Sequence, residues 1–316
     1  MKFSLTVVLT TARDKPELDW FVDSLASERI QLLNFGPPPH MGPYGLIVDG
    51  TDYWLWNRFM TPGGLNVFFS HPKPSIWSGR HRITSQDWWS KSNSLNTAIC
   101  LCRTDWIAFL DDRSVILPGW LDCIAEAMEG GYGVNGGYEK RRHMTVEDGV
   151  IKHGGIITAK DSRIQHMESN GLQNPLPHGG EWCFGCNLAL PLEWCLAVNG
   201  FDETCDGISG EDTIFGLMLH NNGFPMKFDK RMMMIEDRTP GECGPVMRRE
   251  DKGVSPNDKS HALVEKLKGL KRALNEPCGW DLRQIRKDVL AGKPFPLPPE
   301  KNYRDFYDGQ PIAEFK

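Results

Sequence analysis

The chain has 316 residues, of which 40% are hydrophobic and 24% are charged, and its mean hydropathy is −0.41. This composition is typical of a globular protein and excludes a collagen-like or intrinsically disordered chain. No apolar run in the sequence approaches the roughly 20 residues that a membrane-spanning helix needs. The net charge of −5 argues against a protein that coats nucleic acid with its whole surface, although it is compatible with a local basic groove.

The first 15 residues resemble a signal peptide, but their apolar stretch is short, lacks a small-residue cleavage site and ends in charged residues. We therefore predict a buried strand at residues 3–10, which are rich in β-branched side chains. An odd number of cysteines, nine, at irregular spacing and without a secretion signal predicts reduced thiols and a cytoplasmic protein. Cys183 and Cys186 form a CxxC pair, for which buried packing is favoured over a zinc site completed by Cys195 and Cys205.

Strands and helices alternate through the first half of the chain. Apolar residues at helical spacing predict helices from residue 18, around residues 95–102 and after Pro118. Residues 46–50 and the continuous apolar run Trp106–Leu110 are predicted strands. This alternation predicts an α/β fold with a mostly parallel sheet flanked by helices, in which ligands bind beyond the carboxyl ends of the strands.

The second half, from about residue 131, is richer in glycine and is expected to be more irregular. It contains a predicted helix at Asp212–His220 and a predicted strand at Met226–Ile235. Residues 261–290 have a leucine stripe that indicates a further helical region, and the tail from Pro294 is rich in proline.

Three motifs follow one another in a specific order. WIAFLDD occupies residues 106–112, NGFDE occupies residues 199–203, and GED at residues 210–212 opens a predicted helix. In this order they resemble family 2-like glycosyltransferases of the Rossmann-like GT-A fold, over residues 3–240. The resemblance implies a GT-A domain at residues 1–250, in which 1–130 bind the nucleotide sugar and 131–250 hold the acceptor and the catalytic groups. Residues 251–316 are then a helical and Pro-rich extension.

The resemblance also implies an inverting transfer of a sugar from a nucleotide-sugar donor, a UDP-sugar, to an acceptor hydroxyl. The hydroxyl needs a general base, because unassisted it is a poor nucleophile. The family's pattern assigns this role to Asp212, with Glu211 beside it. A plain N-terminal helix cap is the alternative for both residues.

Carboxylates at a strand end can hold Mn²⁺ or Mg²⁺ on the donor diphosphate. Asp111 and Asp112 are the candidates, although Arg113 stands where the family's Asp-x-Asp pattern is usually acidic and could itself contact a phosphate. Where related enzymes have a histidine after the last core strand, this chain has Glu236 and Asp237. Asp237 is therefore a further candidate metal ligand, with a surface pair as the alternative.

The remaining candidates complete the donor and acceptor sites. Thr11, Arg13, Asp49 and Asn96 match donor-binding positions, Lys91 could face a phosphate, and Trp182 and Asn187 are candidate acceptor contacts. A turn carboxylate is the alternative for Asp49, and solvated helix positions are the alternative for Asn96 and Lys91. The acceptor is expected to be a saccharide. A hydroxylated base in DNA is the minority alternative, if the basic clusters at residues 80–82, 140–143 and 259–272 converge.

Two other functions stay open at this point. The first is a catalytically silent module that binds a nucleotide sugar, and the second is a nucleotidyltransferase on a related α/β fold. A nucleotidyltransferase usually needs a Gly-rich phosphate loop after the first strand, which this sequence lacks.

Overall fold

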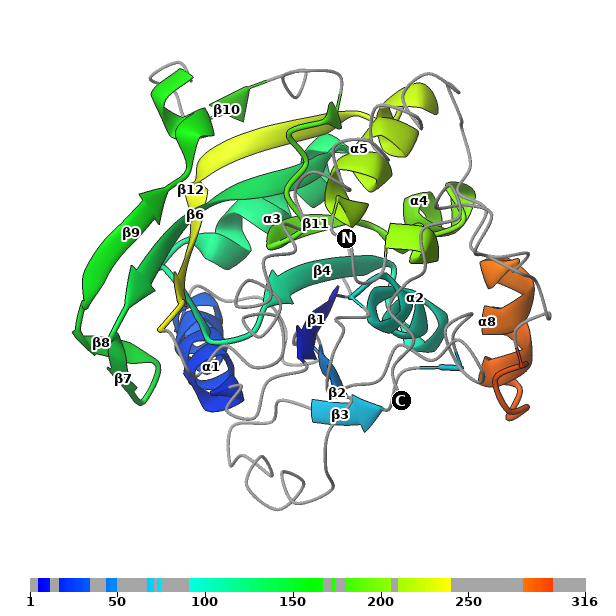
Figure 1. Ribbon diagram of the computed structural model, residues 1–316, viewed down its shortest axis with the longest axis horizontal. Helices are drawn as coiled ribbons and strands as arrows, with labels where there is room; N and C mark the ends of the chain where they lie inside the picture. Colours follow the sequence, from blue (N-terminus) through cyan, green and yellow to red (C-terminus); the bar gives the residue numbers. More distant parts are fainter. Residues whose placement is uncertain are drawn as a thin grey trace, which may run out of the picture.

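A computed structural model describes residues 5–11, 17–34, 44–49, 67–70, 73–74, 91–166, 172–173, 180–205, 210–239 and 281–297. These residues form a curled, mostly parallel sheet with helices on both faces (Figure 1). The strands of this sheet are β1 (Leu5–Thr11), β2 (Tyr44–Asp49), β3 (Val67–Ser70), β4 (Trp106–Asp111), β5 (Ser114–Ile116), β6 (Gly133–Arg142), β9 (Ile156–Lys160), β10 (Leu172–Gln173), β11 (Asn187–Pro191) and β12 (Met226–Asp237). A separate hairpin consists of β7 (Thr145–Glu147) and β8 (Val150–His153). The α-helices are α1 (Leu18–Asn34), α2 (Lys91–Leu101), α3 (Trp120–Gly130), α4 (Leu192–Ala197), α5 (Glu211–Asn221) and α8 (Leu282–Leu290).

The main path of the sheet has the order β10-β12-β6-β11-β4-β1-β2-β3. β1 runs parallel to β2 and β4, β2 runs parallel to β3, and β6 runs parallel to β12. β11 lies between β4 and β6 and runs antiparallel to both, so those two strands point the same way. The carboxyl ends of β1, β2, β4 and β12 therefore lie along one edge of the sheet. The predicted α/β class with a mostly parallel sheet is confirmed.

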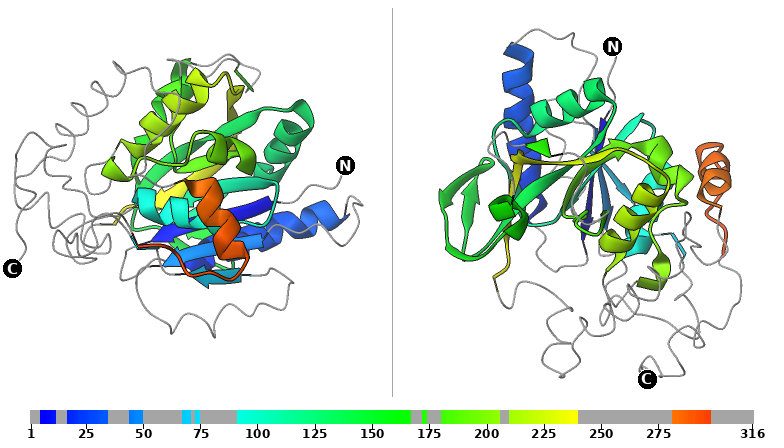
Figure 2. Two further views of the ribbon diagram at one scale, coloured as in Figure 1. Left: turned by 90° about the vertical axis from the view of Figure 1, so that its right-hand side faces the viewer. Right: turned by 90° about the horizontal axis from the view of Figure 1, so that it is seen from above.

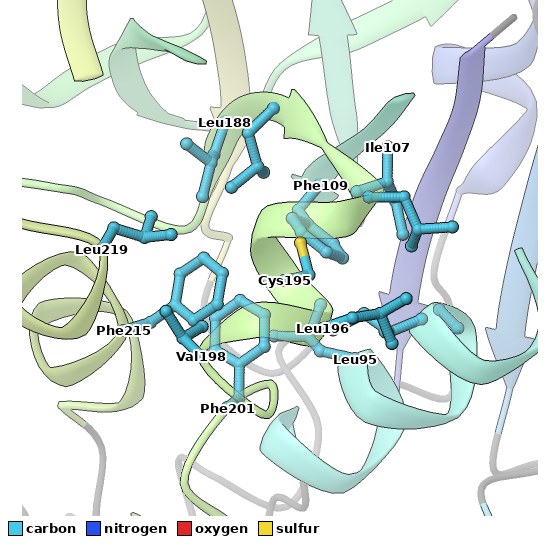
Figure 3. Close-up of a cluster of buried hydrophobic side chains, with 14 of the residues drawn as sticks. Leu95, Ile107, Phe109, Leu188, Cys195, Leu196, Val198, Phe201, Phe215 and Leu219 are labelled. Carbon is cyan, nitrogen blue, oxygen red and sulfur yellow. The ribbon is translucent and has the colours of Figure 1, made fainter. Parts of the chain in front are cut away.

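Alternate residues of β4 point into two hydrophobic cores. Ile107 and Phe109 belong to the core formed with α2, α4 and α5, whereas Ala108 and Leu110 face α1 and α3. The view from above in Figure 2 shows these two helical layers on opposite sides of the sheet. Figure 3 shows the first core, in which the ring of Phe201 stacks on Phe215 with a centroid distance of 4.0 Å. Both faces of β4 are thus buried, as its continuous apolar run predicted.

The predicted helices of the first half are present as α1, α2 and α3, and the predicted strand at residues 3–10 is β1. The predicted helix at Asp212–His220 is α5, and the predicted strand at Met226–Ile235 is β12. Of the helical region expected at residues 261–290, the structure describes α8, which adds Leu282 and Ile285 to the first core. Arg286 of α8 also donates a hydrogen bond of 2.9 Å to the carbonyl of Cys102.

The second half is more regular than the sequence suggested, because it also contributes β6, β9, β11 and the hairpin β7–β8. Strand β6 reads GVNGGYEKRR, and its glycines are typical of a loop. At Gly136 an added Cβ would lie 2.2 Å from the carbonyl oxygen of Met232 and 2.3 Å from the Asn187 amide nitrogen. This glycine is therefore explained by close packing between strands and not by a turn.

Within the described ranges, no helix has the length and apolarity that crossing a membrane requires.

Candidate active site

Three strand ends lie next to one another at the carboxyl edge of the sheet. Thr11 of β1 pairs with Asp49 of β2, and Thr10 pairs with Asp111 of β4. The backbone positions of three sequence-predicted residues, Thr11, Asp49 and Asp111, are thus brought together. The predicted donor contact Arg13 lies outside the described residues.

The side chain of Lys91 links two other segments to this edge. Its Nζ lies 2.6 Å from Asp111 Oδ1 and 3.8 Å from Glu211 Oε1, so the start of α2, the end of β4 and the start of α5 meet here. The side chains of Lys91 and Asp111 are only 8% and 14% exposed. The sequence identified Lys91 as a residue that could face phosphate, and the structure adds its ion pairs with the two acidic groups.

Basic groups around Asp111 favour its ionised form. Burial alone would raise the pKa of Asp111, but Lys91, Arg238 and Lys140 hold that pKa well below its usual range. Burial lowers the pKa of Lys91, and the carboxylates of Asp111, Glu211 and Asp212 more than offset this and raise it. Both members of the pair are therefore charged at neutral pH.

The first turn of α5 presents two acidic residues with different surroundings. Gly210 precedes the helix with a φ of +94°, a left-handed conformation that suits glycine. Glu211 is buried, and burial together with the neighbouring Asp212 raises its pKa to about 7. Glu211 therefore titrates near neutral pH.

Asp212 is half-buried, and backbone donors orient its carboxylate. Its Oδ2 accepts a hydrogen bond of 3.2 Å from the Gly185 N–H, and its Oδ1 accepts one of 2.8 Å from the Thr213 N–H. A Cβ on Gly185 would lie 3.1 Å from the Cβ of Asp212, so the absence of a side chain permits this close approach. The carboxylate is held in a fixed direction at the start of α5, as a general base requires.

Arg238, immediately after β12, is a site residue that the sequence analysis missed. Its Nε donates a hydrogen bond of 2.6 Å to Glu236 Oε1, and one terminal nitrogen lies 3.8 Å from Asp111 Oδ2. The side chain is 40% exposed although Glu236 beneath it is fully buried. A basic residue directly after an acidic pair at the end of the last core strand was the signal in the sequence.

The structure places Asp237 and Arg113, two residues predicted to bind ligands, in a buried ion pair with each other. Arg113 donates to Asp237 Oδ2 at 2.6 Å, and Asp237 Oδ1 accepts hydrogen bonds from the Met144 N–H and the Thr239 hydroxyl. Both side chains are at most 2% exposed. The predicted roles of Arg113 in donor binding and of Asp237 in metal binding stay predictions, which this buried pair does not favour.

Asn96 and Asn187 also lie in the interior, and their predicted contacts with the donor and the acceptor stay predictions. Asn96 donates to Glu203 Oε1 and to the Phe201 carbonyl, and it accepts from the Phe201 N–H. Asn187 donates to two carbonyls, of Gly137 and Met232, and accepts from the indole N–H of Trp120. Both are fully buried, and the protein itself satisfies their amides.

The carboxylates near this edge do not fit a divalent cation. Asp112 is buried, Asp237 is bound to Arg113, and each oxygen of Asp111 faces a basic side chain. No group of three or more His, Cys, Asp or Glu side chains in the described part of the chain is arranged to hold a metal. The expected Mn²⁺ or Mg²⁺ stays a prediction that this set of donors does not favour.

The CxxC segment before β11 contributes packing and a backbone contact. Cys183 and Cys186 are buried, and burial raises the pKa of Cys183 to about 12, so its thiol is protonated. The Cys186 carbonyl accepts a hydrogen bond from the Asp111 N–H. Trp182 is half-buried beside this segment, with its carbonyl bonded to Arg163, and its role as an acceptor platform stays a prediction.

No family model matches this sequence, and no curated protein matches it. Among solved structures, the chain is similar to S. aureus TarS 1-349 in complex with UDP, with 13% identity and a TM-score of 0.52 over 92% of this chain and 70% of that one. It is also similar to S. aureus TarS 1-349 in complex with UDP-GlcNAc, with 14% identity and a TM-score of 0.52 over 84% of this chain and 66% of that one. TarS is a family 2 glycosyltransferase of the GT-A type. The predicted resemblance to this family is therefore confirmed at the level of the fold.

Proposed function

We propose that this chain is an inverting glycosyltransferase, which transfers a sugar from a nucleotide-sugar donor, a UDP-sugar, to an acceptor hydroxyl. The observation that carries the proposal is the position of Asp212. Its carboxylate is oriented by Gly185 at the start of α5, next to the Lys91–Asp111 pair at the carboxyl edge of the sheet. The fold shared with TarS, whose structures hold UDP and UDP-GlcNAc, supports a donor of this class.

In the proposed reaction the acceptor oxygen attacks the anomeric carbon while Asp212 takes the hydroxyl proton. The bond between the anomeric carbon and the phosphate oxygen breaks, and the nucleoside diphosphate leaves with the electron pair. Attack on the face opposite the leaving group inverts the anomeric configuration. Asp212 acts as a general base, a role that contributes about 10²–10⁴-fold to a rate.

The proposed acceptor is a saccharide. Trp182 offers an aromatic ring close in sequence to Gly185, which contacts Asp212, and aromatic rings can pack against the apolar faces of sugars. Of the three basic clusters that would favour DNA, only residues 140–143 are described. In that cluster Arg141 is bound to Glu139 at 2.5 Å, so part of its charge is already balanced.

The proposal is tested with purified protein and a panel of UDP-, GDP-, ADP-, CDP- and dTDP-sugars, with mixed oligosaccharides as acceptors. We expect release of UDP from at least one UDP-sugar. Asp212→Asn should lower turnover by about 10²–10⁴-fold with UDP affinity, measured by calorimetry, within a few-fold of the parent.

Asp122→Asn is a matched control, because Asp122 also lies in the first turn of a helix that follows a left-handed glycine, Gly119, but on the exposed surface of α3. This variant should keep full turnover. If Asp212→Asn transfers within a few-fold of the parent, Asp212 is not the base. Binding of UDP-sugars without any turnover would favour the silent binding module, and release of pyrophosphate would favour a nucleotidyltransferase.

A further inference from the structure

Two basic side chains flank Asp111, one near each oxygen of its carboxylate. Lys91 Nζ lies 2.6 Å from Asp111 Oδ1, and a terminal nitrogen of Arg238 lies 3.8 Å from Asp111 Oδ2. The two cations come from the start of α2 and from the residue after β12, so they converge only in the folded chain. Asp111 thereby aligns two positive groups at the edge where parallel α/β sheets bind ligands.

The surroundings of Arg238 leave its outer side accessible. Glu236, fully buried, holds the guanidinium through the Nε, and the side chain as a whole remains 40% exposed. The terminal nitrogen near Asp111 lies beyond hydrogen-bond distance from it, so that N–H group can donate to an incoming ligand. A guanidinium presents paired donors that match the oxygens of a phosphate group.

A divalent cation would compete with these groups for the same carboxylate. To bind Asp111, it would have to displace Lys91 from Oδ1 and approach Arg238 at Oδ2. Of the two other predicted ligands, Asp237 is bound to Arg113 in the interior and Asp112 is buried. Two of the three positions expected to hold a metal ion, Asp111 and Asp237, are thus already paired with basic side chains of the chain itself.

We propose that Lys91 and Arg238 together hold the donor diphosphate and stabilise the leaving nucleoside diphosphate, so that donor binding needs no divalent cation. This inference rests on the proposed function. When the bond from the anomeric carbon to the phosphate oxygen breaks, the electron pair moves to that oxygen. Lys91 and Arg238 donate hydrogen bonds to the phosphate oxygens on which this charge develops, and the acceptor proton goes to Asp212.

The test measures UDP binding by calorimetry on the full chain, in EDTA and again with Mn²⁺ or Mg²⁺. We expect UDP to bind in EDTA, with affinity changed less than about threefold by either metal. Arg238→Gln should weaken UDP binding in EDTA by about 10–100-fold, the range expected for the loss of charge-assisted hydrogen bonds. Arg238→Lys keeps the charge above the buried Glu236 and should bind UDP more tightly than Arg238→Gln.

Arg231→Gln is the matched control. Arg231 lies on β12, the strand that Arg238 follows, is 47% exposed, and also binds an acidic residue two positions earlier, Asp229. This variant should bind UDP like the parent. UDP binding that requires Mn²⁺ or Mg²⁺, or an Arg238→Gln variant that binds as the parent does, would overturn the inference and leave the proposed function intact. If none of UDP, GDP, ADP, CDP and dTDP binds under either condition, the proposed function fails and the inference fails with it.

Discussion

Two lysine–carboxylate pairs that adjoin α2 differ in their exposure to solvent. Lys73 lies 2.5 Å from Glu203 with both side chains inaccessible, and Asn96 of α2 donates to the same Glu203 oxygen. Lys91, the first residue of α2, lies 2.6 Å from Asp111 with both side chains slightly exposed. The bond lengths are nearly equal, so the difference lies in what surrounds each pair. The charges of the Lys73–Glu203 pair can be neutralised only by other groups of the protein. The Lys91–Asp111 pair is partly exposed, so a ligand can reach it.

The same contrast recurs at the end of β12. Asp237 is paired with the buried Arg113, while its neighbour Glu236 is paired with Arg238, whose outer side is exposed. Of these two adjacent acidic residues, Asp237 thus pairs within the interior, whereas Glu236 holds a basic side chain that reaches the surface at the candidate site. We infer that the exposure of the basic partner separates the pairs that stabilise the fold from those that face a ligand.

The largest expected effect is the loss of stability when the buried pair is broken. Glu203→Gln leaves the ammonium of Lys73 buried without its carboxylate, which is expected to cost about 3–5 kcal/mol of unfolding free energy. Asp111→Asn should cost only about 1–2 kcal/mol, because Lys91 retains Glu211 and some contact with solvent. Urea denaturation of both variants measures the difference. Equal losses would show that exposure does not distinguish the two pairs.

In UDP binding the order of the two variants should be reversed, with Asp111→Asn having the larger effect and Glu203→Gln the smaller. Loss of this carboxylate removes the group that aligns Lys91 and Arg238. We therefore expect the UDP affinity to fall by about tenfold or more. Glu203→Gln should bind UDP within a few-fold of the parent at a temperature where it is folded. Calorimetry on both variants therefore separates the site pair from the structural pair.

A smaller loss of stability is expected from Asn96→Ala, which also tests whether this residue contacts the donor. Asn96 makes three buried hydrogen bonds, and their loss leaves buried partners unsatisfied at a cost of about 2–3 kcal/mol. The UDP affinity should be unchanged. A tenfold loss of affinity with the free energy of unfolding preserved would support the predicted contact of Asn96 with the donor.

The sequence predicted those features that depend on local pattern. The apolar run Trp106–Leu110 indicated a buried central strand, and acidic residues directly after it indicated a site at the carboxyl edge. The local sequence pattern also predicted that the motif Gly210–Asp212 opens a helix. These signals need no knowledge of distant partners, and the structure contains each of these elements.

The sequence could not show the contacts of polar residues whose partners are far away in the chain. Arg113 and Asp237 are 124 residues apart, and nothing local shows that they pair in the interior. Asn187 looked like a ligand contact because it is polar beside a glycine turn, yet its amide bridges β6 and β12. A polar residue near a predicted site can serve the sheet or the ligand, and only the tertiary contacts decide which.

The smallest expected effect is a pH dependence of stability that Glu211 introduces beside the Lys91–Asp111 pair. Burial and Asp212 raise the pKa of Glu211 from an ordinary 4.5 to about 7, so the folded protein binds this proton more tightly than the unfolded chain does. The resulting stabilisation is complete below about pH 4.5 and is lost as the pH rises through 7.

Glu211→Gln removes this pH-dependent contribution to the free energy of unfolding, whereas Glu129→Gln, at an exposed position of α3, serves as the control. Between pH 4.5 and 8 the parent should lose about 1–3 kcal/mol more unfolding free energy than Glu211→Gln, as measured by urea denaturation at each pH. Parallel curves for the parent and both variants would mean that Glu211 has an ordinary pKa and that solvent reaches it as it reaches the open side of Arg238.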